Sequence, residues 1–133
     1  MKKFNVGVIG YSWAAGAHIA AINNTGLAQV TALCSSRKLD FEEISSKHGS
    51  GITCYTDLSK MLSEANIQAV SICSYPSEHA RQAIMAARAG KHLIIEKPVA
   101  LSWDDCLAVE AEVKAAGVKT CVCFECRFSS QLL

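Results

Sequence analysis

The sequence lacks the features that mark several classes of protein. Only two of its 133 residues are proline and eight are glycine, which excludes collagen-like and proline-rich chains. Thirteen Lys and Arg stand against twelve Asp and Glu, so the basic surface of a nucleic-acid-binding protein is missing. No stretch reaches the roughly 18 uninterrupted apolar residues of a membrane span. Half of the residues are hydrophobic, so we expect one packed domain over residues 1–133, with neither nucleic acid nor membrane as a partner.

Cysteine, in contrast, is abundant in this sequence. The chain has seven cysteines, an odd number, and most lie within apolar runs. Secreted disulfide frameworks prefer even numbers in loop-rich chains, so we expect reduced thiols in a cytoplasmic protein. The alternative is a secretory signal, because two lysines after Met1 precede a largely apolar stretch to Ala21. Five residues interrupt that stretch: Asn5, Gly7, Gly10, Ser12 and His18.

Short apolar runs alternate with amphipathic segments along the whole chain. The runs are Phe4–Ile9, Gln29–Cys34, Thr53–Tyr55, Ala69–Cys73, His92–Ile95 and Lys119–Phe124. Most are continuously apolar, which is typical of strands covered on both faces in a parallel sheet. The segments between them repeat apolar residues at helical spacing. Ser102 with Asp105 predicts a capping box, and Gly90 and Gly117 predict helix ends. The pattern predicts an α/β fold, a Rossmann-type doubly wound parallel sheet in three layers, α-β-α.

The first run leads into a turn and then a helix, expected over about residues 15–23. A dinucleotide-binding turn usually reads G-x-G-x-x-G, and here it reads Gly10-x-Ser12-x-x-Ala15. Such a turn brings the backbone and a helix N-terminus close to a pyrophosphate, and the Ser12 hydroxyl is a candidate donor. The pattern alone does not distinguish this from an ordinary strand–helix turn. The candidate contacts are Gly10, Tyr11, Ser12, Trp13, Ala14 and Ala15, with Trp13 either stacking on the cofactor or covering the turn.

The end of the second run bears on which dinucleotide binds. An acid there would hold the ribose hydroxyl of NAD, but the sequence reads Ser35-Ser36-Arg37-Lys38 with no acid before Asp40. Hydroxyls followed by cations suit a 2′-phosphate, which Arg binds through two hydrogen bonds. We therefore expect NADP, with NAD as the alternative. The alternative interpretation is that these residues form an ordinary solvent-exposed basic turn before a helix.

The fifth run ends in Glu96-Lys97-Pro98. Charged residues at the carboxyl end of a buried parallel strand face the crevice where such sheets bind ligands. A lysine there can exchange a proton with a substrate hydroxyl, with Glu96 tuning it or orienting the cofactor. A cis bond before Pro98 would fix the direction of Lys97. A plain salt pair before a turn is the alternative.

These motifs together resemble those of a known family. The sequence resembles the Gfo/Idh/MocA oxidoreductases at two places. One is Gly10-x-Ser12-x-x-Ala15 with His18, and the other is the Ala-Gly-Lys-His sequence of residues 89–92 that leads into residues 96–98. That family includes glucose–fructose oxidoreductase, inositol dehydrogenase and related sugar dehydrogenases. The resemblance spans nearly all of the chain, but it corresponds only to the family's N-terminal cofactor domain.

The resemblance implies roles for particular residues. It makes Lys97 the catalytic residue, with Glu96 and Lys97 near the nicotinamide and a cis Lys97–Pro98 bond. It adds Ser74, Tyr75, Pro76 and His79 to the residues that line the cofactor. Arg127 matches a cofactor-side segment, but Glu125 stands where the family has Asn and Cys126 where it has Arg.

The resemblance also implies an activity that this length of chain does not complete. The activity is hydride transfer between a nicotinamide and a hydroxyl-bearing carbon of a sugar or polyol, in a homo-oligomer. The family's C-terminal substrate domain is absent from these residues, so we expect cofactor binding but little turnover. The alternatives are a non-catalytic nucleotide-binding module or truncated remnant, and a Rossmann-like methyltransferase. The missing acid after the second run and the Glu96-Lys97-Pro98 motif argue against the methyltransferase.

Some cysteine and histidine residues could be mistaken for a metal site or a catalytic site. Cys121, Cys123 and Cys126 lack the paired knuckles of a zinc site, and cysteines on a strand are ordinary small hydrophobes, so no metal is expected. His18 is expected to be packed or solvent-bonded rather than catalytic. His79 remains a weak candidate because it lies near the start of a helix at the crevice.

Overall fold

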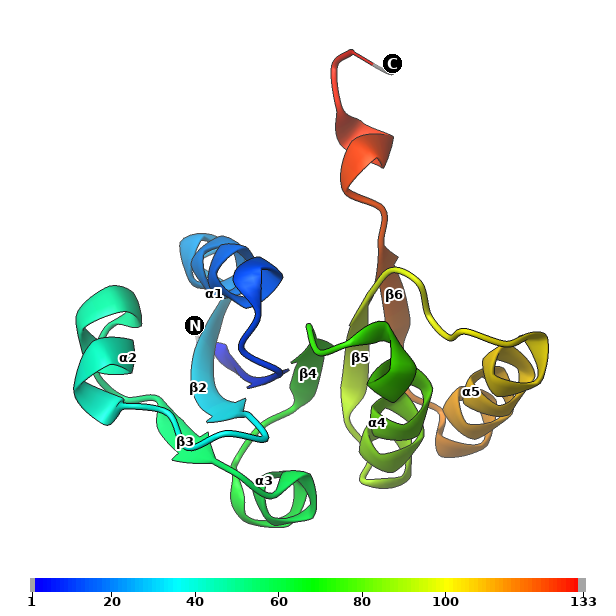
Figure 1. The fold of residues 1–133 in the computed structure, drawn as a ribbon, viewed down its shortest axis with the longest axis horizontal. Coiled ribbons are helices and arrows are strands. Elements are labelled where there is room, and N and C mark those ends of the chain that lie inside the picture. The colour runs from blue at the N-terminus through cyan, green and yellow to red at the C-terminus, as the bar shows by residue number, and fades with distance from the viewer. Residues whose placement is uncertain (1, 132–133) are drawn as a thin grey trace.

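Strands and helices alternate along the chain, and the computed structural model describes residues 2–131 (Figure 1). The strands are β1 (Phe4–Ile9), β2 (Ala28–Cys34), β3 (Thr53–Tyr55), β4 (Ala69–Ile72), β5 (His92–Glu96) and β6 (Thr120–Cys123). The helices are α1 (Trp13–Asn24), α2 (Phe41–His48), α3 (Leu58–Glu64), α4 (Pro76–Arg88), α5 (Trp103–Ala116) and the 3-10 helix η1 (Glu125–Phe128). None of the helices within residues 2–131 has the length and apolarity of a membrane span.

The six strands form one parallel sheet in the order β3-β2-β1-β4-β5-β6. The strand order reverses between β1 and β4, where Ile9 lies opposite Ile72. The loops after these two strands therefore turn to opposite sides, which leaves a crevice at their carboxyl ends. This topology confirms the predicted doubly wound Rossmann-type sheet.

Helices cover the two faces of the sheet as separate layers. On one face, Ile19 of α1 and Ile44 of α2 pack in a cluster with Val8 and Leu33. On the other face, α3, α4 and α5 contribute to a cluster that includes Ile72 and Ile95 of the sheet. Figure 1 shows the same division, with α1 and α2 on one side and α3, α4 and α5 on the other. The predicted three layers are confirmed.

The element boundaries differ slightly from those predicted. The first helix begins at Trp13, two residues before the expected Ala15, because Ser12 is already the extended residue that precedes it. The sixth strand is shorter than expected, since β6 pairs only with β5 and only through Thr120–Cys123. The predicted capping box forms in part: the Ser102 hydroxyl accepts the backbone N–H of Asp105, and the Asp105 carboxylate accepts from that hydroxyl in place of the Ser102 N–H. Gly90 and Gly117 end their helices with positive φ angles of 71° and 66°.

Candidate functional site

Two cavities open at the carboxyl end of the sheet. The large cavity, about 1040 Å³, runs from the β1–α1 turn past the end of β2 to α2, α3 and α4, where its lining reaches Met85. The small cavity, about 400 Å³, lies between α1, the start of α4, the end of β5 and η1. Ser12, Trp13 and Ser74 line both cavities. The two cavities therefore form one crevice that passes over the β1–α1 turn at the switch point of the sheet.

The β1–α1 turn leaves space only for a glycine at its first position. Gly10 has a φ of +88°, and a Cβ atom there would lie 2.6 Å from the Cα and N atoms of Ser74. Ala15 is fully buried where α1 approaches the sheet. Gly16 has no such need, since a Cβ there would meet only a His48 atom at 3.9 Å. The close approach of the two chains in the turn therefore depends on Gly10.

The sequence suggested the Ser12 hydroxyl as a donor to the cofactor, but in the structure this hydroxyl already donates within the protein. Its Oγ donates to the carbonyl oxygen of Cys73 at 2.7 Å, which joins the turn after β1 to the end of β4. The side chain of Ser12, the N-cap residue, makes no capping hydrogen bond to α1, and no acid lies in the first turn of this helix. The first turn of α1 therefore meets the crevice with no carboxylate of its own, which is the arrangement that favours an anion.

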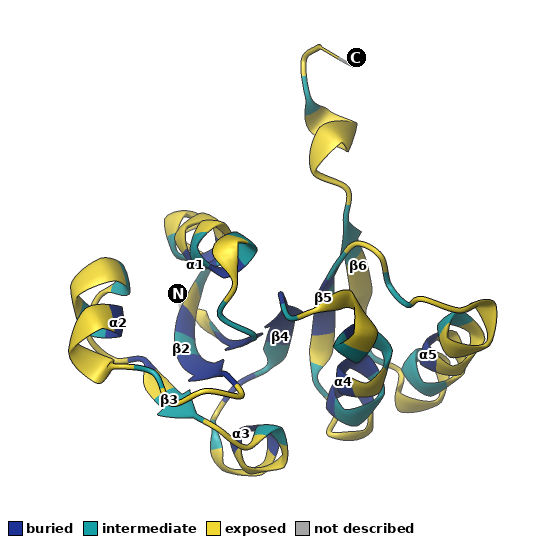
Figure 2. Ribbon diagram, viewed as in Figure 1, coloured by how far each residue is buried: buried dark blue, intermediate teal, exposed yellow. Residues whose placement is uncertain are grey.

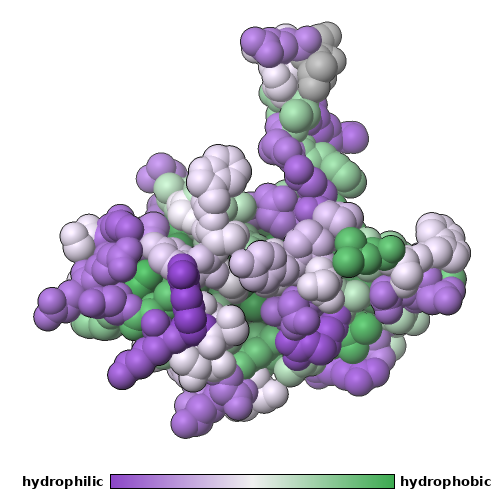
Figure 3. Space-filling view, in the orientation of Figure 1, coloured by the Kyte–Doolittle hydropathy of each residue, from purple (hydrophilic) through white to green (hydrophobic). Residues whose placement is uncertain are grey.

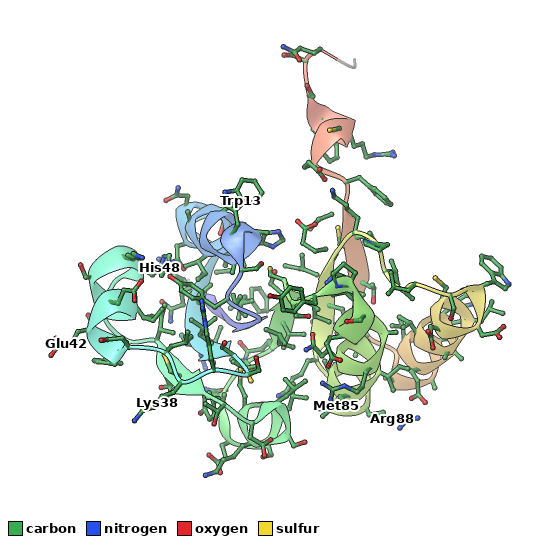
Figure 4. All side chains as sticks on the ribbon, viewed as in Figure 1. Trp13, Lys38, Glu42, His48, Met85 and Arg88 are labelled. Atoms are coloured by element: carbon green, nitrogen blue, oxygen red, sulfur yellow. The ribbon has the colours of Figure 1, made fainter. Side chains whose placement is uncertain are left out.

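The residues after β2 divide into two groups. Ser35, Ser36 and Arg37 line the large cavity, whereas Lys38 points away from the molecule (Figure 4). The Arg37 guanidinium lies 3.4 Å from the carbonyl oxygen of Tyr11, so it reaches back to the β1–α1 turn. Asp40, the first acid after β2, caps α2 by accepting the N–H groups of the residues at 42 and 43. Another acid, Asp57, lines the same cavity from the segment after β3, and it caps α3.

Helix α2 adds charges to the large cavity that sequence reasoning missed. Glu43 and Lys47 both line it and form an ion pair at 2.6 Å. Tyr11 is held beside them, since its hydroxyl lies 2.9 Å from His48 Nε2 and the rings meet edge to face. Burial and then the charge of Lys47 lower the pKa of His48, which favours its neutral form. The spacing of Glu43 and Lys47, four residues apart, could have predicted their ion pair, but no local pattern shows that the pair faces the crevice.

In the small cavity, Glu96 is held by both of its carboxylate oxygens. His18 Nε2 lies 2.8 Å from Glu96 Oε1, and the backbone N–H of Lys97 donates to Oε2 at 3.1 Å. The other ring nitrogen of His18 lies 2.8 Å from the hydroxyl of the fully buried Ser71. His18 is thus packed, as expected, but its contact with Glu96 over 78 residues of sequence had no local signal.

Lys97 and Glu125 form an ion pair across the mouth of the small cavity, with 3.3 Å between Nζ and Oε1. A hydrogen bond from its own backbone, then one from Lys97, lowers the pKa of Glu125. The departure of Glu125 from the family pattern therefore places a carboxylate beside the candidate catalytic lysine. The expected cis peptide bond between Lys97 and Pro98 is present.

The remaining predicted contacts fall into different environments. His79 is 1% exposed, and its two ring nitrogens lie 2.7 Å from the Pro98 carbonyl and 3.0 Å from the Ser74 carbonyl. It therefore ties the loop after β5 to the loop after β4. Tyr75 lines the large cavity, while Ala14, Pro76 and His79 line the small one. Arg127 lies in the exposed η1, which projects away from the sheet, and is outside the lining of both cavities (Figure 1).

The crevice as a whole fits a dinucleotide. It has a backbone approach that a Cβ would close, an uncapped helix N-terminus, and hydroxyls with a cation at the end of β2. The profile of the Gfo/Idh/MocA family, described as an oxidoreductase family with an NAD-binding Rossmann fold, matches residues 4–124. The chain belongs to this family.

Curated relatives in the Gfo/Idh/MocA family are named as dehydrogenases. A 4-carboxy-2-hydroxymuconate-6-semialdehyde dehydrogenase from Sphingobium sp. is 31% identical over 84% of this chain and 35% of its own length. A myo-inositol 2-dehydrogenase from Thermotoga maritima is 29% identical over 92% of this chain and 36% of its own length. The chain therefore spans about a third of the length of these Gfo/Idh/MocA relatives.

Solved structures give the same correspondence. The WlbA dehydrogenase from Bordetella pertussis, in complex with NADH and UDP-GlcNAcA, matches with a TM-score of 0.90 and 28% identity. The match covers 98% of this chain and 40% of that protein. A probable dehydrogenase from Thermotoga maritima matches with a TM-score of 0.86 and 29% identity over 94% of this chain. The 133 residues are thus the NAD-binding Rossmann domain of the Gfo/Idh/MocA fold.

Proposed function

We propose that this chain is the NADP(H)-binding domain of a dehydrogenase acting on a sugar or polyol. The observation that carries the proposal is the continuous crevice, with Ser35–Arg37 at one end and Glu96–Lys97 at the other. A dinucleotide whose pyrophosphate rests on the β1–α1 turn extends in both directions along such a crevice.

The preference for NADP rests on the charges at the end of β2. Ser35 and Ser36 offer hydroxyls, and Arg37 a guanidinium, at the wall of the large cavity. A 2′-phosphate takes several charge-assisted hydrogen bonds from such a set, whereas a free ribose hydroxyl takes few. The acids that line this cavity have partners of their own, since Glu43 pairs with Lys47, Asp57 caps α3 and Glu78 pairs with Arg81. Asp40, the first acid after β2, caps α2.

Lys97 is the proposed catalytic residue. When bound, the nicotinamide supplies hydride transfer to or from the carbon that bears the reacting hydroxyl. The side chain of Lys97 is half exposed at the mouth of the small cavity, with Nζ held toward Glu125. Its role is to take the hydroxyl proton as the alcohol is oxidised, or to return it on reduction. Glu96, bound at both oxygens, holds the backbone of Lys97 in place.

The relatives of this chain are longer than it is, and we propose that the whole enzyme needs that further length for activity. The two cavities within residues 2–131 offer space for a cofactor and are lined by the candidate catalytic residue, Lys97. Positioning of the substrate accounts for much of the rate of such enzymes. We expect a substrate domain, a homo-oligomeric assembly and a cytoplasmic location for the whole enzyme. The 133 residues alone are expected to bind cofactor without turnover, and substrate-dependent reduction of NADP by this chain would contradict that.

Titration with NADPH and NADH, followed by nicotinamide fluorescence, tests the cofactor assignment. We expect NADPH to bind more tightly than NADH. Arg37→Ala should weaken NADPH binding by roughly 10–100-fold, since a charge-assisted hydrogen bond contributes about 1.5–3 kcal/mol, and leave NADH binding nearly unchanged. Lys114→Ala is the matched control, because Lys114 is a cation on α5, paired with Glu110. Tighter binding of NADH, or equal losses for both cofactors, would overturn the NADP assignment.

A further inference from the structure

We propose that His18, Glu96 and Cys123 form a Zn²⁺ site at the inner end of the small cavity. Their ligand atoms all lie within 4.8 Å of one another. The three residues come from three different elements, α1, β5 and β6. Glu96 and Cys123 lie opposite each other in the parallel register, so neighbouring strands fix their spacing.

The chemistry of the three ligands is that of a zinc site. Imidazole nitrogen, carboxylate oxygen and thiolate sulfur are the ligand types that Zn²⁺ takes in proteins. A thiolate is a poor ligand for Mg²⁺ and Ca²⁺, which prefer oxygen, so the set favours Zn²⁺ over these ions. Cys123 is one of the free thiols of the chain, and all three residues are partly buried.

Neighbouring groups already orient two of the ligands. The buried Ser71 hydroxyl lies 2.8 Å from His18 Nδ1, which turns Nε2 toward Glu96. The backbone N–H of Lys97 holds Glu96 Oε2, which turns Oε1 toward His18. Hydrogen bonds of this kind set the direction of metal ligands and raise their affinity.

The adjustment needed to admit the ion is small. His18 Nε2 and Glu96 Oε1 are 2.8 Å apart, and tetrahedral zinc would separate them to roughly 3.3 Å. From the 4.8 Å limit, the sulfur would close in by at most about 1.2 Å to reach its place. On binding, the Cys123 thiol releases its proton to solvent, and a proton on His18 Nε2 moves to Nδ1, where it is donated to Ser71 Oγ.

His18 and Glu96 line the small cavity and Cys123 does not, so the fourth position is expected on the cavity side, away from the sulfur. A water molecule there would complete the tetrahedron, as in zinc sites with three protein ligands. The nearby Lys97 ammonium is paired with Glu125, which offsets its repulsion of the ion. The same cavity holds one end of the dinucleotide in the proposed function, so we infer that Zn²⁺ and NADPH exclude each other; this last step rests on that function.

Cobalt substitution and zinc competition test the site in the reduced chain. Co²⁺ should give tetrahedral absorption bands with a thiolate charge-transfer band, and Zn²⁺ should displace one equivalent of it. Cys123→Ser should remove the charge-transfer band and weaken Zn²⁺ binding by about 100-fold or more, since even groups behind the ligands contribute 10–100-fold. His18→Gln should weaken it similarly. Thermal unfolding of each variant checks that it still folds.

Cys121→Ser is the matched control, because Cys121 is an exposed cysteine two residues earlier on β6, on the same face but outside the cluster. It should change Zn²⁺ affinity by less than twofold. Equal losses in Cys121→Ser and Cys123→Ser, or no loss in either, would overturn the site. Zn²⁺ should weaken NADPH binding in the unmodified chain and not in Cys123→Ser. If NADPH affinity is unchanged while Zn²⁺ is bound, the inference that the two ligands exclude each other is wrong, whereas the Zn²⁺ site itself stands.

Discussion

The two halves of the sheet differ in how fully they are covered. In the β3-β2-β1 half, called here the covered end, helices lie on both faces, and the last four residues of β1 are all buried. At the β5–β6 end, α4 and α5 cover one face only, so burial alternates along β5 and no residue of β6 is fully buried. Figure 2 shows this contrast between dark blue inner strands and the yellow and teal of β6 and α5.

This difference separates the turn around Gly10 from the residues to which we assign proposed chemistry. The covered end builds the turn around Gly10, where a close backbone approach needs a rigid frame. The half-covered end carries Glu96, Lys97 and Cys123 on or beside the face that lacks a helix. Leu101, in the loop before α5, and Trp103, the first residue of α5, are both exposed. Figure 3 shows green side chains at the surface around α4 and α5. The isolated domain is therefore expected to self-associate through this end.

The largest expected effect contrasts the two faces of one strand. Ile95 is fully buried toward α4 and α5, whereas Ile94 is only partly buried on the other face. Ile95→Ala should lower the free energy of unfolding by about 2–5 kcal/mol, because it leaves a cavity in the core. Ile94→Ala should cost clearly less, and urea unfolding measures both. Equal losses would mean that the second face is covered as well.

The next effect contrasts Gly10 in the β1–α1 turn with Gly16 in α1. Gly10→Ala forces a Cβ against the Ser74 backbone at a positive φ, so we expect a loss of about 1–3 kcal/mol in stability and of cofactor binding. Gly16→Ala lies within α1 with space for a methyl group, and should raise stability by about 0.5–1 kcal/mol. Thermal unfolding and NADPH titration measure the pair. Unimpaired cofactor binding by Gly10→Ala would contradict the role given to the turn.

Alkaline pH should weaken the covered end of the sheet. Burial raises the pKa of Cys34 to about 11 and that of Cys73 to about 12. A thiol ionises near pH 8.5 in the unfolded chain, so the folded state holds more protons above that pH. The stability contributed by these two thiols is therefore complete below about pH 8.5 and is lost as pH rises toward 11–12, by about 2 kcal/mol for each thiol at pH 10. Urea unfolding across this range checks the slope, and a flat profile would contradict it.

The smallest effect lies at the start of α5, on the half-covered end. The Ser102 hydroxyl accepts the backbone N–H of Asp105, and Ser102→Ala removes this cap. The expected loss is about 1 kcal/mol in the free energy of unfolding. Ser102→Asp, which keeps an acceptor, should retain most of the stability in the same thermal measurement. A loss of equal size in both variants would show that the cap is not what stabilises this end.

Much of the fold and part of the site could be predicted from neighbouring residues alone. Continuous apolar runs predicted buried parallel strands, and the spacing between them predicted the covering helices. Gly10 and Glu96–Pro98 were recognisable because their chemistry lies within one short segment. Boundaries at the sheet edge were less accurate, since β6 ends where its only partner strand ends, and no local signal marks that point.

The sequence by itself determined the strand–helix alternation, the glycine of the first turn and the absence of an acid after β2, because each depends on a local pattern. Only the tertiary structure decided that the Ser12 hydroxyl bonds to Cys73, that Lys47 faces the large cavity, and that His18 and Cys123 meet Glu96. These contacts join segments up to 105 residues apart, from His18 to Cys123. Crossover connections and strand register set them, and neither can be read from a single stretch of chain.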